Sequence, residues 1–297
     1  MTDPPAARPP AGRPPAPRPP APAPLPVPVV DNHTHLDHTR DGDEPFAVAD
    51  ALAAAAAVGV TRVVQIGCEL ESARWTVDAV ERFPQLLGGV ALHPTEATDI
   101  LAKDGEAGLA AALAEIEALA GHPRVRVVGE TGLDHYWVRP DDIAGRAAQV
   151  TSFRAHVALA KRLGKVLQIH DRDAHEDVLR VLAEEGAPER TVFHCFSGDA
   201  AMARFVADQG WYLSFAGTLT FKNAADLREA ARVVPLDQVL VETDAPYLAP
   251  APHRGRTNAS YLVPLTVRCL AEVVRRDLAD VCARLDATSE HLYGPWF

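Results

Sequence analysis

Two histidines separated by one residue, His33 and His35, stand directly after an apolar run, in the heptapeptide DNHTHLD at residues 31–37. Successive side chains of a strand alternate between its two faces, so both imidazoles would point to the same side. Divalent metals with nitrogen and oxygen ligands usually take about four to six ligands in all. The pair therefore predicts part of a metal site, and the remaining ligands must come from other segments.

Five further histidine, glutamate and aspartate residues end apolar, β-branched runs in the same way. They are His93, Glu130, His170, His194 and Asp244. A single histidine at a strand end is more often packed or solvated than metal-bound, but several independent strands ending this way favour a shared site. Glu130 is suited to bridging two metals, because its carboxylate has an oxygen for each. Its alternative role is to cap the next helix.

Two carboxylates, Glu242 and Asp244, lie on the same side of the last such run. One can bind metal and hold the attacking water while the other orients the ligands, although Glu242 could instead form a buried ion pair with an arginine. His93, which is followed by a proline, could donate to a phosphate oxygen or simply form a turn. The segment PHRGRTN at residues 252–258 adds two arginines, whose forked guanidinium groups match phosphate geometry and favour phosphoester over amide substrates.

These residues are positioned by a regular alternation of short β-branched runs with alanine-rich amphipathic segments. The predicted strands are residues 27–31, 62–67, 86–93, 124–130, 165–170, 191–194, 211–215 and 238–244. The predicted helices are residues 45–58, 72–82, 106–120, 146–163, 174–185, 200–208, 224–233, 262–275 and 278–285. Eight β–α repeats predict an α/β fold, a single-domain (β/α)8 TIM barrel rather than an open sheet. In such barrels the active site lies at the carboxyl ends of the strands, where the ligand-type residues would converge.

The composition limits the class of protein. The chain of 297 residues is 47% hydrophobic, enough for a full core, yet no apolar run reaches the roughly 18 residues of a membrane span. Four widely spaced cysteines without a CxxC pair predict neither disulfides nor a structural zinc site, and they fit a cytoplasmic location. The net charge of −11 argues against nucleic-acid binding through a broad basic surface, although divalent metals would offset carboxylates locally.

The first 24 residues differ from the rest in composition. They are rich in proline, alanine and arginine, and 13 of the 25 prolines lie within the first 30 positions. Dense prolines favour extended polyproline II, which buries nothing. We therefore expect a disordered tail at residues 1–24, followed by one barrel domain at residues 25–297. A PxxP ligand for a partner domain is the alternative for the tail.

Six segments together resemble the TatD family of metal-dependent DNases. They are DNHTHLD at 31–37, LHP at 92–94, GETGLD at 129–134, IHDRDA at 169–174, HCFSG at 194–198 and ETDAPYL at 242–248. The resemblance implies a metal-dependent hydrolase of the amidohydrolase-like barrel superfamily that acts as a nuclease on DNA. The chain departs from the family at His135, where an aromatic residue is usual, in the segment RTNAS at 256–260, and in the proline-rich tail.

The resemblance also implies roles for individual residues. The first set of metal ligands is His33, His35, Glu130 and Asp244, and the second is Glu130, His170 and His194. His93, Arg254 and Asn258 would face the scissile phosphate. Related barrels often bridge their metals with a carboxylated lysine, but no lysine of this chain lies on the fourth predicted strand, so Glu130 takes that place.

We predict two divalent ions, Mg, Mn or Zn, about 3.5–4 Å apart, which lower the pKa of a bound water and clamp the oxygens of a phosphodiester, with Asp244 and Glu130 as catalytic residues. Asp244 would be the general base. A barrel mouth admits an end or a single strand more readily than a duplex, so 3'-to-5' exonuclease action on single-stranded DNA is favoured. The alternatives are hydrolysis of an ester or amide at the same site, such as the ester of a D-aminoacyl-tRNA, and a non-catalytic binding protein. We expect no membrane association and no obligate protein partner.

Overall fold

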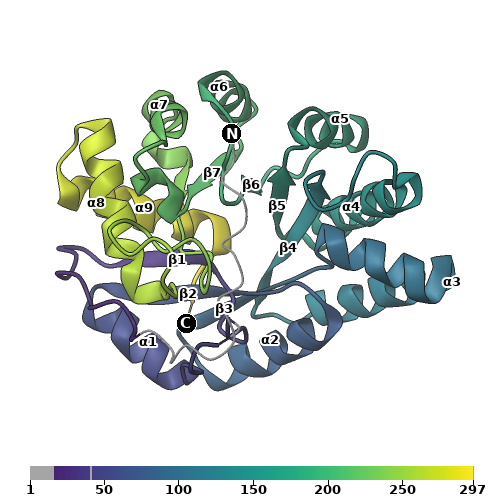
Figure 1. The fold of residues 1–297 in the computed structure, drawn as a ribbon, viewed down its shortest axis with the longest axis horizontal. Coiled ribbons are helices and arrows are strands. Elements are labelled where there is room, and N and C mark those ends of the chain that lie inside the picture. Colours follow the sequence, from purple (N-terminus) through teal and green to yellow (C-terminus); the bar gives the residue numbers. More distant parts are fainter. Residues whose placement is uncertain (1–16, 41, 297) are drawn as a thin grey trace.

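Short runs rich in valine, leucine and isoleucine form eight parallel strands that pair in chain order in one sheet (Figure 1). The structure is a computed structural model and describes residues 17–40 and 42–296. The strands are β1 (Val29–Thr34), β2 (Val60–Gly67), β3 (Leu86–Val90), β4 (Val125–Asp134), β5 (Val166–Arg172), β6 (Thr191–Phe193), β7 (Tyr212–Phe215) and β8 (Val239–Val241). The predicted (β/α)8 barrel is confirmed.

Helices follow the strands and form the outer layer (Figure 1). The α-helices are α1 (Val48–Ala57), α2 (Leu70–Arg82), α3 (Pro94–Ala120), α4 (Ile143–Leu163), α5 (His175–Glu185), α6 (Ala200–Asp208), α7 (Ala225–Val233), α8 (Val263–Val274) and α9 (Leu278–Tyr293). The 3-10 helices in the described part of the chain are η1 (Gly217–Thr220), η2 (Leu236–Gln238) and η3 (Ser260–Leu262). Within residues 17–40 and 42–296, none of the helices combines the length and the apolar character needed to cross a membrane.

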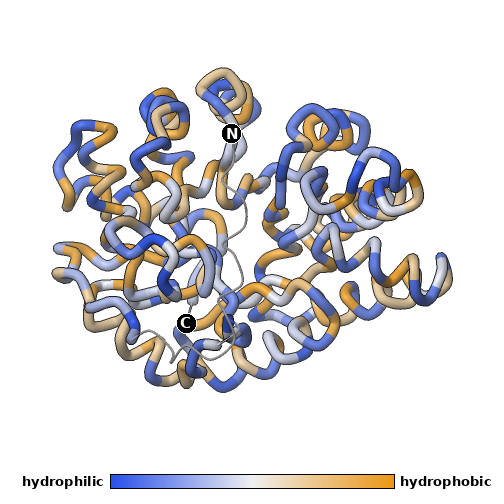
Figure 2. The backbone as a smooth tube through the Cα atoms, in the orientation of Figure 1, coloured by the Kyte–Doolittle hydropathy of each residue, from blue (hydrophilic) through white to orange (hydrophobic). Residues whose placement is uncertain are grey.

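The core has two layers. One buried cluster takes side chains from all eight strands and fills the barrel interior; its strand members are Val30, Val64, Ile66, Leu87, Val127, Val166, Val192, Tyr212 and Leu240. It ends against Tyr293 and Trp296 near the end of the chain. A larger cluster lies between the strands and the helices, whose hydrophobic and hydrophilic residues interleave along each helix (Figure 2). This interleaving is the amphipathic pattern expected of helices that pack one face on a barrel.

Contacts between β1 and the segment after β8 close the barrel. Thr34 and Ala245 form a parallel β-bridge, and the His35 amide donates to the Ala245 carbonyl at 2.8 Å. The Asp244 amide donates to the His33 carbonyl at 3.0 Å. The closure therefore sets the two histidines of β1 beside Asp244, although 209 residues or more separate them along the chain.

β4, α3 and α9 extend furthest beyond their predicted ranges, and α9 continues from the predicted end at residue 285 to Tyr293. β4 continues past residue 130, because residues 131–134 pair in parallel with residues 169–172 of β5. α3 begins at Pro94, with the side chain of His93 accepting from the Thr95 amide, and a break at Gly105 divides it. A proline at the first helical position lacks an N–H that would have no partner there, so Pro94 suits this helix start.

The segment expected to be a disordered tail divides in two. Residues 1–16 lie outside the described residues. Residues 17–24 have no helix or strand, as their prolines predict, but they lie against the barrel instead of burying nothing: the hydroxyl of Tyr261 donates to the Pro19 carbonyl at 2.6 Å, and Arg18 lies 4.2 Å over the ring of Phe46. Arg268 donates to the Ala23 carbonyl at 3.1 Å. Proline-rich backbone offers carbonyl acceptors with few N–H donors of its own, so side-chain donors of the barrel can hold it.

Candidate metal centre

The first group of predicted ligands meets at the carboxyl end of the barrel. The Nε2 atoms of His33 and His35 lie 3.2 Å apart, and each is 3.6 Å from Oε1 of Glu130. Asp244 Oδ1 lies 3.3 Å from His35 Nε2 and 3.7 Å from His33 Nε2. Four nitrogen and oxygen donors from β1, β4 and the segment after β8 thus converge on one point, a donor set that suits a divalent cation.

The second group surrounds the other oxygen of Glu130. Glu130 Oε2 lies 2.9 Å from His170 Nδ1 and 2.7 Å from His194 Nε2. His93 Nε2 is 3.3 Å from His170 Nδ1, so His93 stands beside this group from the start of α3. Glu130 therefore presents one oxygen to each group, as expected of a carboxylate that bridges two cations.

Glycines on either side of Glu130 allow β4 to press against β5. A Cβ atom at Gly129 would lie 2.6 Å from the Cβ of Gln168. Gly132 has a φ of +146°, and a Cβ there would overlap the carbonyl oxygen of His170. Only glycine tolerates both the positive φ and the close approach. The GETG segment thus brings the glutamate beside the histidine of the next strand.

The outward nitrogens of the β1 histidines have fixed partners. His33 Nδ1 lies 2.7 Å from the side-chain oxygen of Gln168, and His35 Nδ1 lies 3.0 Å from the carbonyl of Ile66. Because both partners are acceptors, they hold the proton on Nδ1 and leave Nε2 to bind a metal.

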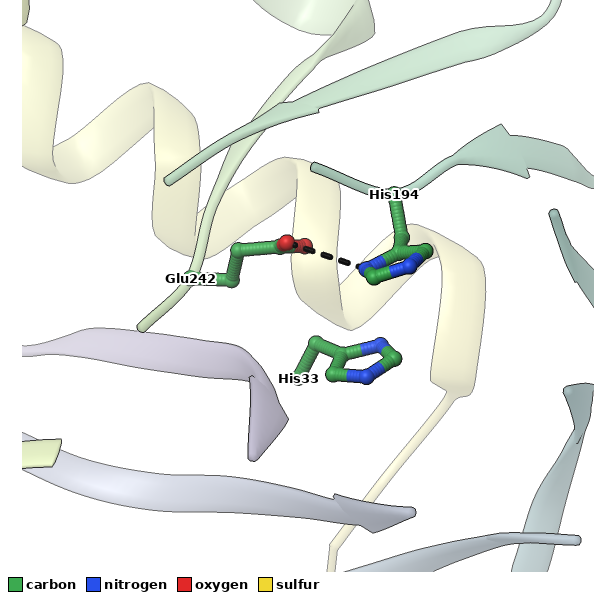
Figure 3. Close-up of side chains that lie close together, drawn as sticks. All are labelled: His33, His194 and Glu242. Carbon is green, nitrogen blue, oxygen red and sulfur yellow. Dashed lines mark hydrogen bonds and ion pairs between the residues drawn. The ribbon is translucent and has the colours of Figure 1, made fainter. Parts of the chain in front are cut away.

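Carboxylates play the same part for the other two histidines. His170 Nε2 lies 3.1 Å from Asp134 Oδ2, and His194 Nδ1 lies 3.1 Å from Oε1 of the fully buried Glu242. Figure 3 shows Glu242 facing His194 while the ring of His33 stacks below it, with ring centroids 4.0 Å apart. Although His33, His194 and Glu242 are close enough to hold a cation among them, Glu242 Oε1 faces the nitrogen remote from Glu130 and also accepts the Cys195 amide at 2.8 Å. We therefore assign it an orienting role, with no arginine partner among the described residues.

The electrostatics of the cluster fit a cation. Burial lowers the pKa of His35, but the hydrogen bond to Asp244 and the charge of Glu130 outweigh burial and raise it to about 10. Burial also lowers the pKa of His170, but its hydrogen bonds with Asp134 and Glu130 outweigh burial and raise this pKa to about 9. Protons on these imidazoles thus balance the buried carboxylates, and divalent cations could replace them. Burial and the neighbouring His170 instead lower the pKa of His93 to about 3, so His93 is neutral.

The predicted substrate residues lie in different settings. Arg254 is exposed, with its guanidinium 4.6 Å over the ring of Phe221. Asn258 is buried, its amide nitrogen donates to the Thr243 carbonyl at 2.9 Å, and its amide oxygen accepts the Ala259 amide at 2.9 Å. Asn258 therefore supports the backbone next to Asp244, whereas the sequence led us to expect a substrate contact.

Two positions that orient the ligands, Asp134 and Gln168, have no assigned role in the sequence interpretation. The signal for Gln168 is present, because a polar residue two positions before His170 must share its side of an otherwise apolar strand. Asp134 stands four residues after Glu130, and its contact with His170 depends on the extension of β4, which the sequence does not reveal.

A barrel rim that gathers histidines and carboxylates around one glutamate is an arrangement typical of metal-dependent hydrolases. A sequence model of the family "TatD related DNase" matches residues 30–294, nearly the whole barrel. The chain belongs to this TatD family of metal-dependent hydrolases.

Its relatives agree with this placement. The uncharacterized metal-dependent hydrolase TatD of Mycobacterium tuberculosis is 49% identical over 269 residues, which cover 90% of this chain and 98% of that protein. The uncharacterized metal-dependent hydrolase YcfH of Escherichia coli is 38% identical over 245 residues, covering 82% of this chain and 86% of its own length. Among solved structures, YjjV, a TatD homolog from Escherichia coli, superimposes with a TM-score of 0.77 at 25% identity, covering 90% of this chain and 98% of its own.

Proposed function

We propose that this hydrolase cleaves phosphodiester bonds of DNA, removing nucleotides from the 3' end of a single strand. The observation that supports it most is the position of Glu130, which places one oxygen 3.6 Å from both β1 histidines and the other within 2.9 Å of His170 and His194. Two adjacent cation sites suit an in-line displacement at phosphorus, in which an oxygen attacks and another leaves.

One cation would be held by His33, His35, Glu130 and Asp244, and the other by Glu130, His170 and His194. Two divalent ions, Mg, Mn or Zn, would supply a Lewis acid for the phosphate and lower the pKa of water. Asp244 is suited to accept the proton of the attacking water, because its side chain is 15% exposed while those of His33, His35 and Glu130 are at most 6% exposed. Burial raises the pKa of Asp244, but the hydrogen bond from His35 and nearby positive charges lower it below its ordinary value, so the carboxylate is ionised at neutral pH.

The choice of DNA rests on the family and on the cations of the rim. The matched family is described as "TatD related DNase". Exposed Arg254 lies in a loop and half-buried Arg172 at the end of β5, both on the side of the barrel that carries the metal centre. Arginine suits a chain of phosphates more than a single acyl ester. His93 would donate a hydrogen bond to the phosphate from beside His170. DNA as substrate, the direction of digestion and a cytoplasmic location stay predictions.

The experiment is a digestion with a matched pair of variants. Purified protein, stripped with chelator and reloaded separately with Mg, Mn or Zn, is given single-stranded oligonucleotides labelled at the 5' or the 3' end, closed single-stranded circles, and D-aminoacyl-tRNA. We expect a metal-dependent ladder from the 3' end, no cutting of circles, and loss of activity in Glu130→Gln but not in Glu106→Gln, an exposed carboxylate on α3. Deacylation of the tRNA without any cutting of DNA would overturn the proposal, as would full activity of Glu130→Gln.

A further inference from the structure

An aromatic and cationic cluster, Tyr136, Trp137 and Arg172, stands beside the metal ligands. Trp137 is 55% exposed, although tryptophan is usually well buried. The rings of Tyr136 and Trp137 meet edge to face, with centroids 5.1 Å apart. The guanidinium of Arg172 lies 3.9 Å over the Tyr136 ring and 5.8 Å from the Trp137 ring. We call these three residues the stacking platform.

A single carboxylate connects the stacking platform to the metal centre. Asp134 Oδ2 lies 3.1 Å from His170 Nε2, while its Oδ1 accepts the amides of Tyr136 at 2.9 Å and Trp137 at 2.8 Å. Arg172 follows His170 by two residues on β5, and its carbonyl accepts the His135 amide at 2.9 Å. The exposed indole is thus fixed next to the reacting site by the same strand ends that supply the ligands.

The charge of the stacking platform lies on Arg172. Among residues 17–40 and 42–296 this side chain forms no ion pair with a carboxylate, and its guanidinium lies over the two aromatic rings. An arginine stacked on an aromatic ring keeps its edge N–H groups free to bind an anion. A tryptophan face beside such a guanidinium matches a nucleotide, which joins a flat base to a phosphate.

The location distinguishes this feature from general surface hydrophobicity. Of the other exposed large apolar residues in the described part of the chain, Ile143 and Phe205 belong to the outer helices α4 and α6, and Tyr247 follows β8 on the rim. Trp137 lies in the loop directly after β4, three residues beyond Asp134. Its position suits a group of the substrate that lies next to the scissile bond.

We infer that the stacking platform is a base-binding subsite, which stacks one unpaired nucleobase of the DNA strand on Trp137 while Arg172 contacts a phosphate of the same strand. This inference rests on the proposed nuclease function and deepens it. Bases paired within a duplex have both faces covered by their neighbours, so the subsite would select a frayed or single-stranded end. It would also favour a polynucleotide over a phosphoester that lacks bases.

The test compares intact and abasic strands. KM and kcat are measured for a 3' single-stranded oligonucleotide and for oligonucleotides that lack one base at each of the last three positions, with wild type, Trp137→Ala, Trp137→Phe and the control Ile143→Ala. Stacking of one base predicts that Trp137→Ala raises KM for the intact strand roughly tenfold, with little change in kcat. Trp137→Phe should restore most of the affinity, and Ile143→Ala, 78% exposed on α4, should match wild type.

The abasic series shows whether the lost contact is with a base. One abasic position should raise the wild-type KM by a similar factor, and at that position Trp137→Ala should add little more. An unchanged KM of Trp137→Ala on the intact strand, or an equal rise on every abasic strand, would overturn the subsite. If wild type cuts no DNA, the proposed function fails first. Fluorescence anisotropy of a labelled oligonucleotide with metal-free protein then decides the subsite separately, because Trp137→Ala must still bind more weakly than Ile143→Ala.

Discussion

The two ends of this barrel use charge in opposite ways. At the carboxyl end, buried carboxylates and imidazoles face one another around Glu130 and are balanced through shared protons. At the amino end, cations stand at the starts of the strands and donate to backbone carbonyls. Arg124, before β4, donates to the carbonyls of Val80 and Pro84 at 2.8 Å and of Trp296 at 2.9 Å.

The pattern at the amino end repeats on neighbouring strands. Arg190, before β6, donates to the Leu292 carbonyl at 3.0 Å, and Lys165, before β5, donates to the His122 carbonyl at 3.0 Å. These acceptors belong to fixed backbone, including the last helix of the chain. At the carboxyl end the partners are protons, which a metal can replace. The difference indicates that the amino end stabilises the fold and the carboxyl end performs the chemistry, as in other barrels of this kind.

The largest expected effect is on catalysis and comes from the carboxyl end. Asp244→Asn removes the proposed general base, and it should lower kcat by roughly a hundredfold to ten-thousandfold. The midpoint of thermal unfolding of the metal-free protein should fall only modestly, because the ionised carboxylate favours folding through His35, but that imidazole can release its proton once the partner charge is removed. Steady-state kinetics and calorimetry measure the two effects. Asp50→Asn, an exposed site on α1, serves as the control, and a rate equal to that of the control would remove Asp244 from the mechanism.

The reverse result is expected at the amino end. Arg124→Ala leaves several carbonyls without their donor, and hydrogen bonds from a charged group predict a loss of about 3 kcal/mol in the free energy of unfolding. Urea denaturation measures the loss, and kcat of the folded variant should stay within about twofold of wild type, because the strands still place the ligands. Arg139→Ala, whose side chain is 82% exposed, should lose almost nothing. Equal stability of the two variants would contradict the proposed division between the ends.

A smaller effect is expected from the residue that orients His194. Glu242→Gln keeps the shape of the side chain but removes its charge, so the imidazole becomes a weaker ligand, and metal affinity should fall roughly tenfold to a hundredfold. Competition with a chelating dye measures the affinity directly, without an activity assay. The control is Glu290→Gln, a carboxylate 59% exposed beside Arg62 at the amino end. If both variants bind metal as wild type does, Glu242 has only a packing role.

A buried histidine of α4, between the two ends of the barrel, predicts a pH effect on the stability of the fold. Burial lowers the pKa of His156 on α4 to about 4, and its Nε2 accepts the Leu92 amide while its Nδ1 donates to the Ser152 carbonyl. Because the unfolded chain takes up a proton near pH 6.5 and the folded chain does not, stability present above that pH is lost as the pH falls towards 4. From pH 7.5 to 5 the loss attributable to His156 is about 2 kcal/mol.

Urea denaturation at these two pH values tests this effect. His156→Gln preserves a donor and an acceptor but does not titrate, so its stability should fall less over this range than that of wild type. His291→Gln, exposed near the end of α9, should follow wild type. A fall in His156→Gln as large as in wild type would show that other groups cause the acid sensitivity.

The sequence predicts the fold, and the convergence of the candidate ligands at one rim, because both follow from short-range patterns. The alternation of apolar runs and amphipathic segments determines the barrel, and the barrel brings residues at strand ends such as His33, His170 and His194 to one rim. The confirmed family and fold follow from the same segments.

What the sequence does not predict depends on contacts between distant segments. β4 extends to Asp134 because β5 pairs with it. The side-chain amide of Asn258 bonds to Thr243 and Ala259 because the loop returns to the segment that follows β8. Residues 17–24 have the composition of a solvated tail, and their position depends on Tyr261 and Arg268, which lie more than 230 residues later. Composition carries no information about such partners.

The two carboxylate oxygens of Asp134 have different partners, and this links the binding of metal to the binding of substrate. One of its oxygens holds a histidine proposed to bind metal, and the other holds the loop that carries Trp137. Binding of a metal at His170 and binding of a base at Trp137 would each restrict the side chain of Asp134. The free energies of metal binding and of oligonucleotide binding are therefore coupled. Such coupling is reciprocal. We therefore expect a single-stranded oligonucleotide to raise the affinity for metal by the same factor by which metal raises the affinity for the oligonucleotide. We expect Asp134→Ala to reduce this factor in paired titrations, leaving the part that comes from direct contact between metal and phosphate.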